Sequence, residues 1–200
     1  MENKQKTIET AANLFKQYGI RSVTVDNVCE ELRISKKTFY TYFPQKEDLV
    51  DAILEHTEKQ FFDKFRGLLY SGNAIESLMQ LIKEIKKALD CKSPIMYYDL
   101  KKYYSNLLKK HEDIRKNQIE EWFSQNLRQG IEEGYYRENI DVELASMFHV
   151  LQLNTTFSAM KEASQNFPKR RVLDFYIDLI VHLIGNEKGI KYFEKHYSKD

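Results

Sequence analysis

Residues 24–50 have the sequence TVDNVCEELRISKKTFYTYFPQKEDLV, which contains the start and stop signals of two short helices. Thr24 is a natural N-cap for the first helix, in which apolar residues repeat at helical spacing as far as Leu32. Ser35 can cap the second helix, and the proline at position 44 ends it. Only the residues 33–35 separate the two. Two short helices joined by such a tight turn predict a helix-turn-helix.

The second of these helices, over residues 36–43, has two different faces. Phe39 and Phe43 lie one turn apart, so we expect them to anchor the helix to the core. The opposite face points away from the core. Its residues are Lys36, Lys37, Tyr40 and Thr41.

Positive charge is concentrated around this helix, because residues 33–46 hold four Lys and Arg side chains and no acidic one. The net charge of the whole chain is only +1, so binding to nucleic acid must come from a local patch. A helix start that presents Lys, Thr and Tyr fits the major groove, and Lys46 fits a phosphate oxygen. The alternative is a solvated basic surface helix. The cap, the turn and the apolar stripe around the charges favour DNA binding.

The rest of the sequence predicts helices only, since 7 Gly, 3 Pro and few β-branched runs leave long helices uninterrupted. Residues 4–18 form an apolar stripe that Gly19 ends. We therefore predict an all-α protein with a three-helix helix-turn-helix domain over residues 1–45 and a larger helical domain over residues 46–200. The expected helices of the larger domain are 45–70, 74–89, 94–109, 112–134, 141–164 and 168–185, with a break near His111 and a weaker helical tail after Gly185.

Residues 5–50 resemble the DNA-binding domain of the TetR (tetracycline-repressor) family of bacterial regulators. The resemblance is carried by Ala12, Phe15, Gly19, the Thr24-Val25 pair, Leu32 and the run SKKTFYTYFPQKEDL over residues 35–49. The residues that it places against bases or the nearby backbone are Lys36, Lys37, Thr38 and Tyr40. The residues that it places against phosphates are Thr24, Thr41, Tyr42 and Lys46.

Two positions depart from the family pattern. Arg33 stands at the turn position that usually holds Gly, and a left-handed conformation there costs roughly 1 kcal/mol relative to glycine. A side chain that reaches a DNA phosphate would explain Arg33. Lys37 stands where a small residue is common, so the operator sequence of relatives does not transfer to this chain.

The resemblance implies a transcriptional regulator, a repressor that a small-molecule effector releases from a near-palindromic operator of double-stranded DNA. The larger domain would then bind the effector and form the dimer. We expect the chain to be cytoplasmic and to lack a membrane partner, because no signal-peptide pattern or apolar span of ~20 residues is present. Cys29 and Cys91 are isolated thiols, which suits a reducing compartment.

Residues 168–185 carry two apolar stripes, and a helix that is apolar on two sides must be buried on two sides. A two-fold copy of the chain is the simplest partner for the second stripe. The alternative is that one chain covers both stripes. With the helix over residues 141–164, this helix is expected to form a four-helix dimer interface. The expected interface residues are Phe148, Leu151, Val172, Phe175, Tyr176, Leu179, Ile180 and Leu183.

Aromatic residues in the larger domain are candidates for lining the effector pocket that the resemblance implies. Paired tyrosines would suit an apolar or aromatic effector with a polar handle, because buried hydroxyls need partners. The alternative is plain core packing. The candidates are Phe61, Phe65, Met96, Tyr97, Tyr103, Tyr104, Trp122 and Phe123.

No group of residues in the sequence predicts an enzyme. The five histidines occur singly, outside any metal-binding spacing, and no nucleophile elbow, P-loop or dinucleotide-binding turn is present. We therefore expect no catalysis, no metal and no cofactor. The competing hypothesis is a helical protein-interaction or ligand-binding module that no longer binds DNA, against which the intact set of Lys36, Lys37, Tyr40 and Lys46 argues.

Overall fold

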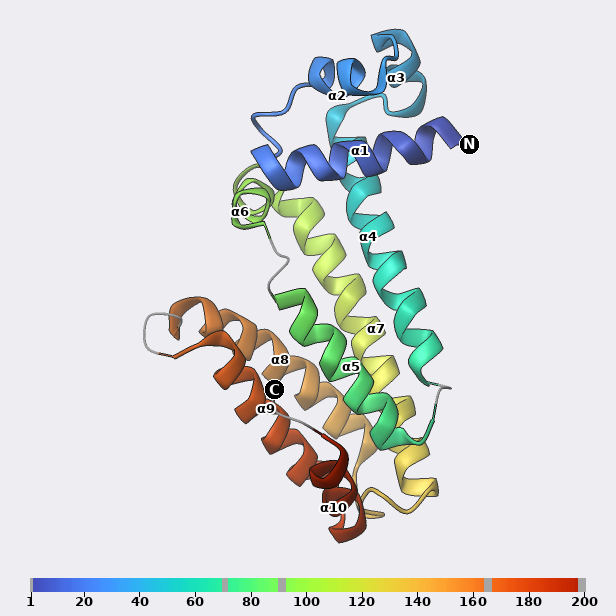
Figure 1. Ribbon diagram of the computed structural model, residues 1–200, viewed down its shortest axis with the longest axis vertical. Coiled ribbons are helices and arrows are strands. Elements are labelled where there is room, and N and C mark those ends of the chain that lie inside the picture. Colours follow the sequence, from blue (N-terminus) through green and yellow to red (C-terminus); the bar gives the residue numbers. More distant parts are fainter. Residues whose placement is uncertain (1, 70–71, 90–92, 164–166, 198–200) are drawn as a thin grey trace. The chain divides into compact units, whose positions relative to one another are not determined.

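The computed structural model describes residues 2–69, 72–89, 93–163 and 167–197, and over these residues it is all-α, as predicted (Figure 1). One isolated bridge pairs Tyr136 with Gly185. The helices are α1 Glu2–Tyr18, α2 Val25–Leu32, α3 Lys36–Tyr42, α4 Lys46–Leu69, α5 Ala74–Leu89, α6 Pro94–Tyr103, α7 Ser105–Glu132, α8 Val142–Ala163, α9 Lys169–Ile184 and α10 Glu187–His196.

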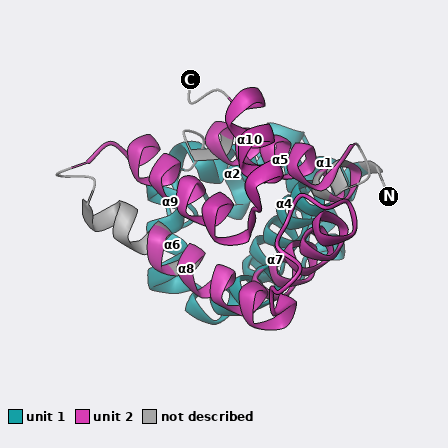
Figure 2. Ribbon diagram, turned by 90° about the horizontal axis from the view of Figure 1, so that it is seen from below, with its two compact units in different colours: residues 1–62, 90–115 teal, residues 63–89, 116–200 magenta. Residues whose placement is uncertain are grey.

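The chain forms two compact units, which Figure 2 shows in different colours. Unit 1 consists of residues 1–62 and 90–115, and unit 2 consists of residues 63–89 and 116–200. Helices α4 and α7 each run from one unit into the other. Unit 1 therefore contains α6 and the start of α7 in addition to the helix-turn-helix, whereas the sequence pattern suggested one boundary near residue 45.

Unit 1 has one apolar core to which every one of its helices contributes. Phe15, Val28, Phe39 and Phe43 are buried there, as their helical spacing predicted. Leu100 of α6 and Leu108 of α7 join the same cluster, together with partly buried residues. The helix-turn-helix is therefore held by residues from far along the sequence as well as by its own stripe.

The break predicted near His111 is wrong. Helix α7 continues through this position, and the interruption lies at Tyr104, whose backbone adopts φ −134° and ψ 40° and whose N–H bonds to the carbonyl of Leu100. His111 is buried inside α7, where both ring nitrogens meet carboxylates of α4, at 2.7 Å from Asp51 and 2.7 Å from Glu58. His111 is therefore part of a tertiary hydrogen-bond network with two carboxylates and does not mark a helix end.

The core of unit 2 forms around a close approach between α7 and the segment that follows it. A Cβ at Gly130 would lie 2.1 Å from the ring of Tyr136, so only glycine fits there. The Tyr136 hydroxyl donates to Asn126 at 3.0 Å, and Asn126 donates to the carbonyl of Ala74 at 2.8 Å. Burial raises the pKa of Tyr136. These contacts join α7 to the start of α5 inside unit 2.

Helix α10 closes one end of unit 2 and replaces the weak tail predicted from the sequence. Asn186 caps it, since its side chain accepts from the N–H of Gly189 at 2.9 Å. The Tyr192 hydroxyl donates to Glu76 of α5, and Phe193 is buried. This segment forms a helix of 10 residues that is capped at its start, although its sequence is mostly polar.

Some expected features lie outside the described residues: residues 70 and 164 at predicted helix ends, Cys91, and the side chain of Phe65. Among the helices that the structure describes, none has the length and apolar character required to cross a membrane.

Candidate nucleic-acid interface

Thr24 begins α2 through a reciprocal capping box. Its Oγ1 accepts from the backbone N–H of Asn27 at 3.2 Å, and the Asn27 side chain accepts from the backbone N–H of Thr24 at 2.9 Å. A box of this kind satisfies two N–H groups that a helix start leaves without partners. Thr24 is exposed, so the residue predicted to position a phosphate also fixes where α2 starts.

The turn between α2 and α3 contains the strained residue that the sequence suggested. Arg33 adopts a left-handed conformation with φ 54° and ψ 41°. Its backbone N–H donates to the carbonyls of Cys29 and Glu30 and so closes the last turn of α2. Among the described residues, Arg33 is the only one other than glycine that has a positive φ. Its side chain is exposed next to the start of α3.

Replacing Arg33 with Gly should stabilise unit 1 by about 1 kcal/mol, because glycine adopts a left-handed conformation without the Cβ clash. The same change should weaken DNA binding and flatten the log–log salt dependence by about 0.9 if Arg33 meets one phosphate. Urea unfolding and duplex binding in a salt series measure the two effects. Arg33→Lys is the matched control, which keeps the charge and the strain. An Arg33→Gly variant that is less stable than wild type would contradict the strain.

Helix α3 presents the polar face that the sequence predicted. Ser35 caps it by accepting from the N–H of Thr38 at 3.0 Å. Phe39 is fully buried, and Tyr40 next to it is 48% exposed, with the two rings edge to face at 5.5 Å. Lys37 and Thr41 are exposed as well. The helix is therefore anchored on one side and exposes Lys, Tyr and Thr side chains on the other, where the Thr41 hydroxyl donates to the carbonyl of Thr38 at 2.6 Å.

Lys36 has a partner that sequence reasoning missed. Its Nζ lies 2.8 Å from a carboxylate oxygen of Asp26 on α2, and both side chains are exposed. The hydrogen bond from Lys36 to Asp26 raises the pKa of Lys36, so the side chain is firmly cationic. An exposed pair of this kind contributes little to stability. The DNA contact that the resemblance gives Lys36 stays a prediction.

Lys46 points inward in this structure. Its Nζ donates to the carbonyls of Ile20 and Val23, in the loop between α1 and α2. Burial lowers the pKa of Lys46, and the negative charge of Asp99 acts in the opposite direction. These bonds use two of the three N–H groups of the ammonium. The phosphate role that the resemblance gives Lys46 stays a prediction, and the structure adds a second role as a clamp on the loop.

An exposed apolar face runs along α8 and α9, which pack against each other within unit 2. On α8 the spacing is i, i+3, i+4, i+7, and on α9 it is i, i+4, i+8, so each helix contributes one stripe. Phe148 is 54% exposed and Phe175 is 65% exposed. The large apolar residues of this α8–α9 face are Leu144, Met147, Phe148, Leu151, Phe175, Leu179 and Leu183.

Two residues of the expected dimer interface lie inside the chain instead. Tyr176 is 8% exposed, and its hydroxyl lies 2.9 Å from Nδ1 of His149, whose ring stacks on Phe123 at 3.8 Å. Ile180 is also buried. Burial lowers the pKa of His149 to about 3, so this imidazole is neutral. The α9 residues expected at the interface therefore divide between the core, which holds Tyr176 and Ile180, and the α8–α9 face, whereas Val172 is half-buried.

The described candidates for an effector pocket belong to both units, and none of them lines either of the two cavities formed by the described residues. Met96 and Tyr104 pack against the core of unit 1, Tyr97 and Tyr103 are partly exposed on α6, and Phe61 packs on a neighbouring ring. Trp122 and Phe123 are buried in unit 2.

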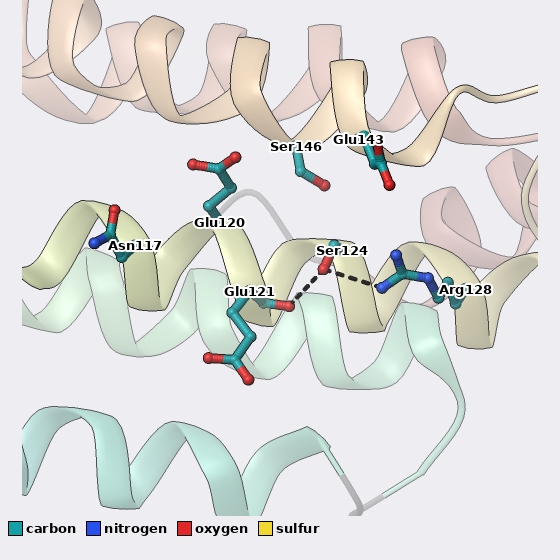
Figure 3. Close-up of a pocket in the computed structure, with 7 residues that line it drawn as sticks. All are labelled: Asn117, Glu120, Glu121, Ser124, Arg128, Glu143 and Ser146. Carbon is teal, nitrogen blue, oxygen red and sulfur yellow. Dashed lines mark hydrogen bonds between the residues drawn. The ribbon is translucent and has the colours of Figure 1, made fainter.

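A groove of about 350 Å³ between α7 and α8 has a different lining (Figure 3). Glu120 and Ser146 point toward the space between the two helices. The groove is polar, so it does not match the apolar or aromatic effector that the sequence suggested. Its lining residues are Asn117, Glu120, Glu121, Ser124, Arg128, Glu143 and Ser146.

An anchored short helix with a basic, hydroxyl-bearing free face, preceded by a capped helix and a tight turn, defines the class of helix-turn-helix DNA-binding proteins. Comparison with known proteins agrees. Residues 8–53 match the model of the family described as bacterial regulatory proteins, tetR family. The chain is 30% identical over 146 residues to the HTH-type transcriptional repressor KstR2 of Mycobacterium tuberculosis. The aligned region covers 70% of this chain and 72% of the relative.

Solved structures show the same fold. The reduced form of Escherichia coli NemR aligns with a TM-score of 0.72 at 17% identity and covers 92% of this chain and 98% of that one. The structure of KstR2 of Mycobacterium tuberculosis, a ketosteroid transcriptional regulator, aligns with a TM-score of 0.56 at 25% identity over 92% and 95% of the two chains. The chain belongs to the TetR family, and it is a DNA-binding transcriptional repressor.

Proposed function

We propose that this repressor binds a near-palindromic operator as a homodimer and that a small-molecule effector bound in its larger helical part releases it. The observation that carries the DNA-binding part is the exposed face of α3, where Lys37 and Tyr40 stand free beside a strained basic turn. We also propose that the protein is not an enzyme. The candidate contacts are Thr24, Arg33, Lys36, Lys37, Thr38, Tyr40, Thr41, Tyr42 and Lys46.

The two candidate roles on α3 differ in what they contribute to binding. Contacts to phosphates fix the position of the protein on the duplex and carry no sequence information, whereas contacts to base edges select the sequence. Lys37 lies in the first turn of α3, which is the part of a recognition helix that meets base edges. Lys37 is therefore our candidate for reading a base, and Arg33 is our candidate for a phosphate.

The homodimer is supported by the α8–α9 face. Among the described side chains of two adjacent helices, seven large apolar ones are exposed, and such a continuous face on a protein surface marks an interaction site. A second copy offers the same self-complementary stripes by a two-fold axis, which also doubles the recognition helix. Two recognition helices related by a two-fold axis require two inverted half-sites in the operator.

Release by an effector would follow from a difference in effector affinity between DNA-binding and non-binding states. The buried pair of His149 and Tyr176, together with the buried Trp122 whose indole N–H has no hydrogen-bond partner among the described residues, supplies polar groups inside unit 2. The unpartnered indole N–H favours an effector that carries a hydrogen-bond acceptor on an apolar body. That the aromatic residues and Met96 named from the sequence line this pocket remains part of the proposal.

Replacing Lys37 with Ala should change the operator that the protein prefers. A lost contact to a base edge weakens discrimination by about 1–3 kcal/mol at one position. Duplexes selected from a random library by wild type and by Lys37→Ala should differ at one position in each half-site. Lys101→Ala, an exposed lysine on α6, is the matched control and should recover wild-type sequences. Identical sequences from Lys37→Ala and wild type would contradict the base-reading role.

A further inference from the structure

The loop between α1 and α2, residues 19–24, is held in place through hydrogen bonds to its backbone groups. Ile20 and Val23 bury their side chains, so the polar backbone groups next to them need partners within the protein. No regular secondary structure supplies these partners here. Side chains from two other helices of unit 1 supply them instead.

Lys46, at the start of α4, holds the loop on one side, because its ammonium donates to the carbonyls of Ile20 and Val23. Asp99 of α6 holds it on the other side. One carboxylate oxygen of Asp99 accepts from the backbone N–H of Arg21 at 2.9 Å, and Asp99 is only 6% exposed. Two opposite charges therefore hold three backbone groups of one short loop.

Helix α6 contacts this loop along one face, since Ile95, Asp99 and Tyr103 lie four residues apart. The guanidinium of Arg21 lies over the Tyr103 ring at 4.6 Å. Gly19 adopts a positive φ of 86°, and a Cβ there would lie 2.9 Å from Asp99 Oδ2 and 3.2 Å from Ile95. The loop and α6 are thus in close contact, with Gly19 as the point of closest approach.

The end of α1 is held by α6 as well. The Ser93 hydroxyl, at the N-cap of α6, donates to the carbonyl of Lys16 at 2.6 Å. Figure 1 shows α6 against the C-terminal end of α1. Because the loop ends at Thr24, which caps α2, any movement of the loop moves the start of the helix-turn-helix.

We propose that Asp99 is a positioning residue for DNA binding, which with Lys46 holds the α1–α2 loop so that α2 and α3 meet DNA in the correct orientation. Asp99 does not touch DNA in this proposal. The inference rests on the proposed function, since it concerns how the DNA-binding helices are presented.

The test compares operator binding by Asp99→Ala, Asp99→Asn and wild type. The probe is a fluorescent duplex selected from a random library by the wild-type protein, titrated in a salt series. Asp99→Ala should bind about tenfold more weakly, the equivalent of one lost charge-assisted hydrogen bond of about 1.4 kcal/mol. Its salt slope should stay unchanged, because no phosphate contact is lost. Asp99→Asn should bind within about threefold of wild type, because its amide oxygen still accepts from Arg21.

Asp113→Ala is the matched control, since Asp113 is an exposed aspartate of unit 1 on α7. Removing an acid favours DNA binding through charge alone, so Asp113→Ala should bind as tightly as wild type or slightly more tightly. Weaker binding by Asp99→Ala therefore has the opposite sign from the charge effect. Amide hydrogen exchange gives a local readout, and Arg21 should exchange faster in Asp99→Ala while the rest of unit 1 keeps its protection.

Binding by folded Asp99→Ala within twofold of wild type would overturn the proposal, and so would equal losses in Asp99→Ala and Asp99→Asn. If Asp99→Ala does not fold, Tyr103→Ala decides, because Tyr103 is 40% exposed and its removal takes away the stacking on Arg21 together with a contact to its neighbour Lys102. We expect about threefold weaker binding from it, and unchanged affinity would overturn the proposal. If wild type retains no duplex, the proposed function fails, and Arg21 exchange still tests the hold on the loop.

Discussion

Replacing Phe148 with Asp should convert the protein to a monomer of 23.9 kDa and reduce operator affinity by at least about a hundredfold. Phe148 lies within the apolar stripe of α8, and a carboxylate there would be buried without a partner in a two-fold interface. A monomer brings one recognition helix to the operator, so it loses the gain in effective concentration that the second helix supplies.

Sedimentation at micromolar concentration measures the mass, and circular dichroism confirms that the helices persist. Leu179→Asp tests the same face on α9 and should give the same result. Ile114→Asp is the matched control, because Ile114 is an exposed apolar residue of α7, 40% exposed, that lies in unit 1. A dimer that survives both Phe148→Asp and Leu179→Asp would show that another surface joins the two chains.

Replacing His111 with Leu should destabilise the protein by about 3 kcal/mol at pH 7, the largest effect that we expect on stability. Both His111 ring nitrogens lie 2.7 Å from a carboxylate oxygen, one of Glu58 and one of Asp51, so the ring is a buried hydrogen-bond donor to the acids of α4. Leu would leave both carboxylates in place without this donor. Lys110 and Arg115 of α7 still pair with them and limit the loss.

The effect of His111→Leu should shrink as the pH falls. Burial raises the pKa of Asp51, but hydrogen bonds from Lys110 and His111 lower it by more, so its folded-state pKa lies below its ordinary value. Stability from Asp51 is therefore present above the unfolded pKa of about 4 and is lost as the pH falls through the folded value. Wild type should thus lose more stability in acid than His111→Leu does.

Urea unfolding at pH 7 and near pH 3, which lies below the unfolded pKa of about 4, measures both effects. His196→Leu, which replaces an exposed histidine of α10, is the control and should cost less than about 0.5 kcal/mol. Equal destabilisation by His111→Leu at the two pH values would show that the network contributes by packing and not by charge.

Local signals predicted the helix-turn-helix well because they act within a few residues. The caps at Thr24 and Ser35, the buried pair Phe39 and Phe43, and the left-handed Arg33 all lie where the sequence placed them. Each depends on a hydrogen bond, a stripe or a turn that closes within one or two helical turns.

Contacts between distant residues could not be predicted in the same way. Asp99 lies 78 positions from Arg21 in the sequence, so no spacing rule connects them. The side of α9 that faces solvent depends on packing against α8, which is why Tyr176 and Ile180 were assigned to the interface although they are buried. His111 resembled a helix end because its partners on α4 are more than fifty residues away.

The central claim is that two copies of this helix-turn-helix bind one operator. Sedimentation of the wild-type protein on a duplex selected from a random library measures the number of chains per duplex, and the selected sequences give the half-site spacing. We predict two chains per duplex and inverted half-sites about 10 base pairs apart from centre to centre. One chain per duplex on a single half-site, or no duplex retained at any salt concentration, would contradict the account.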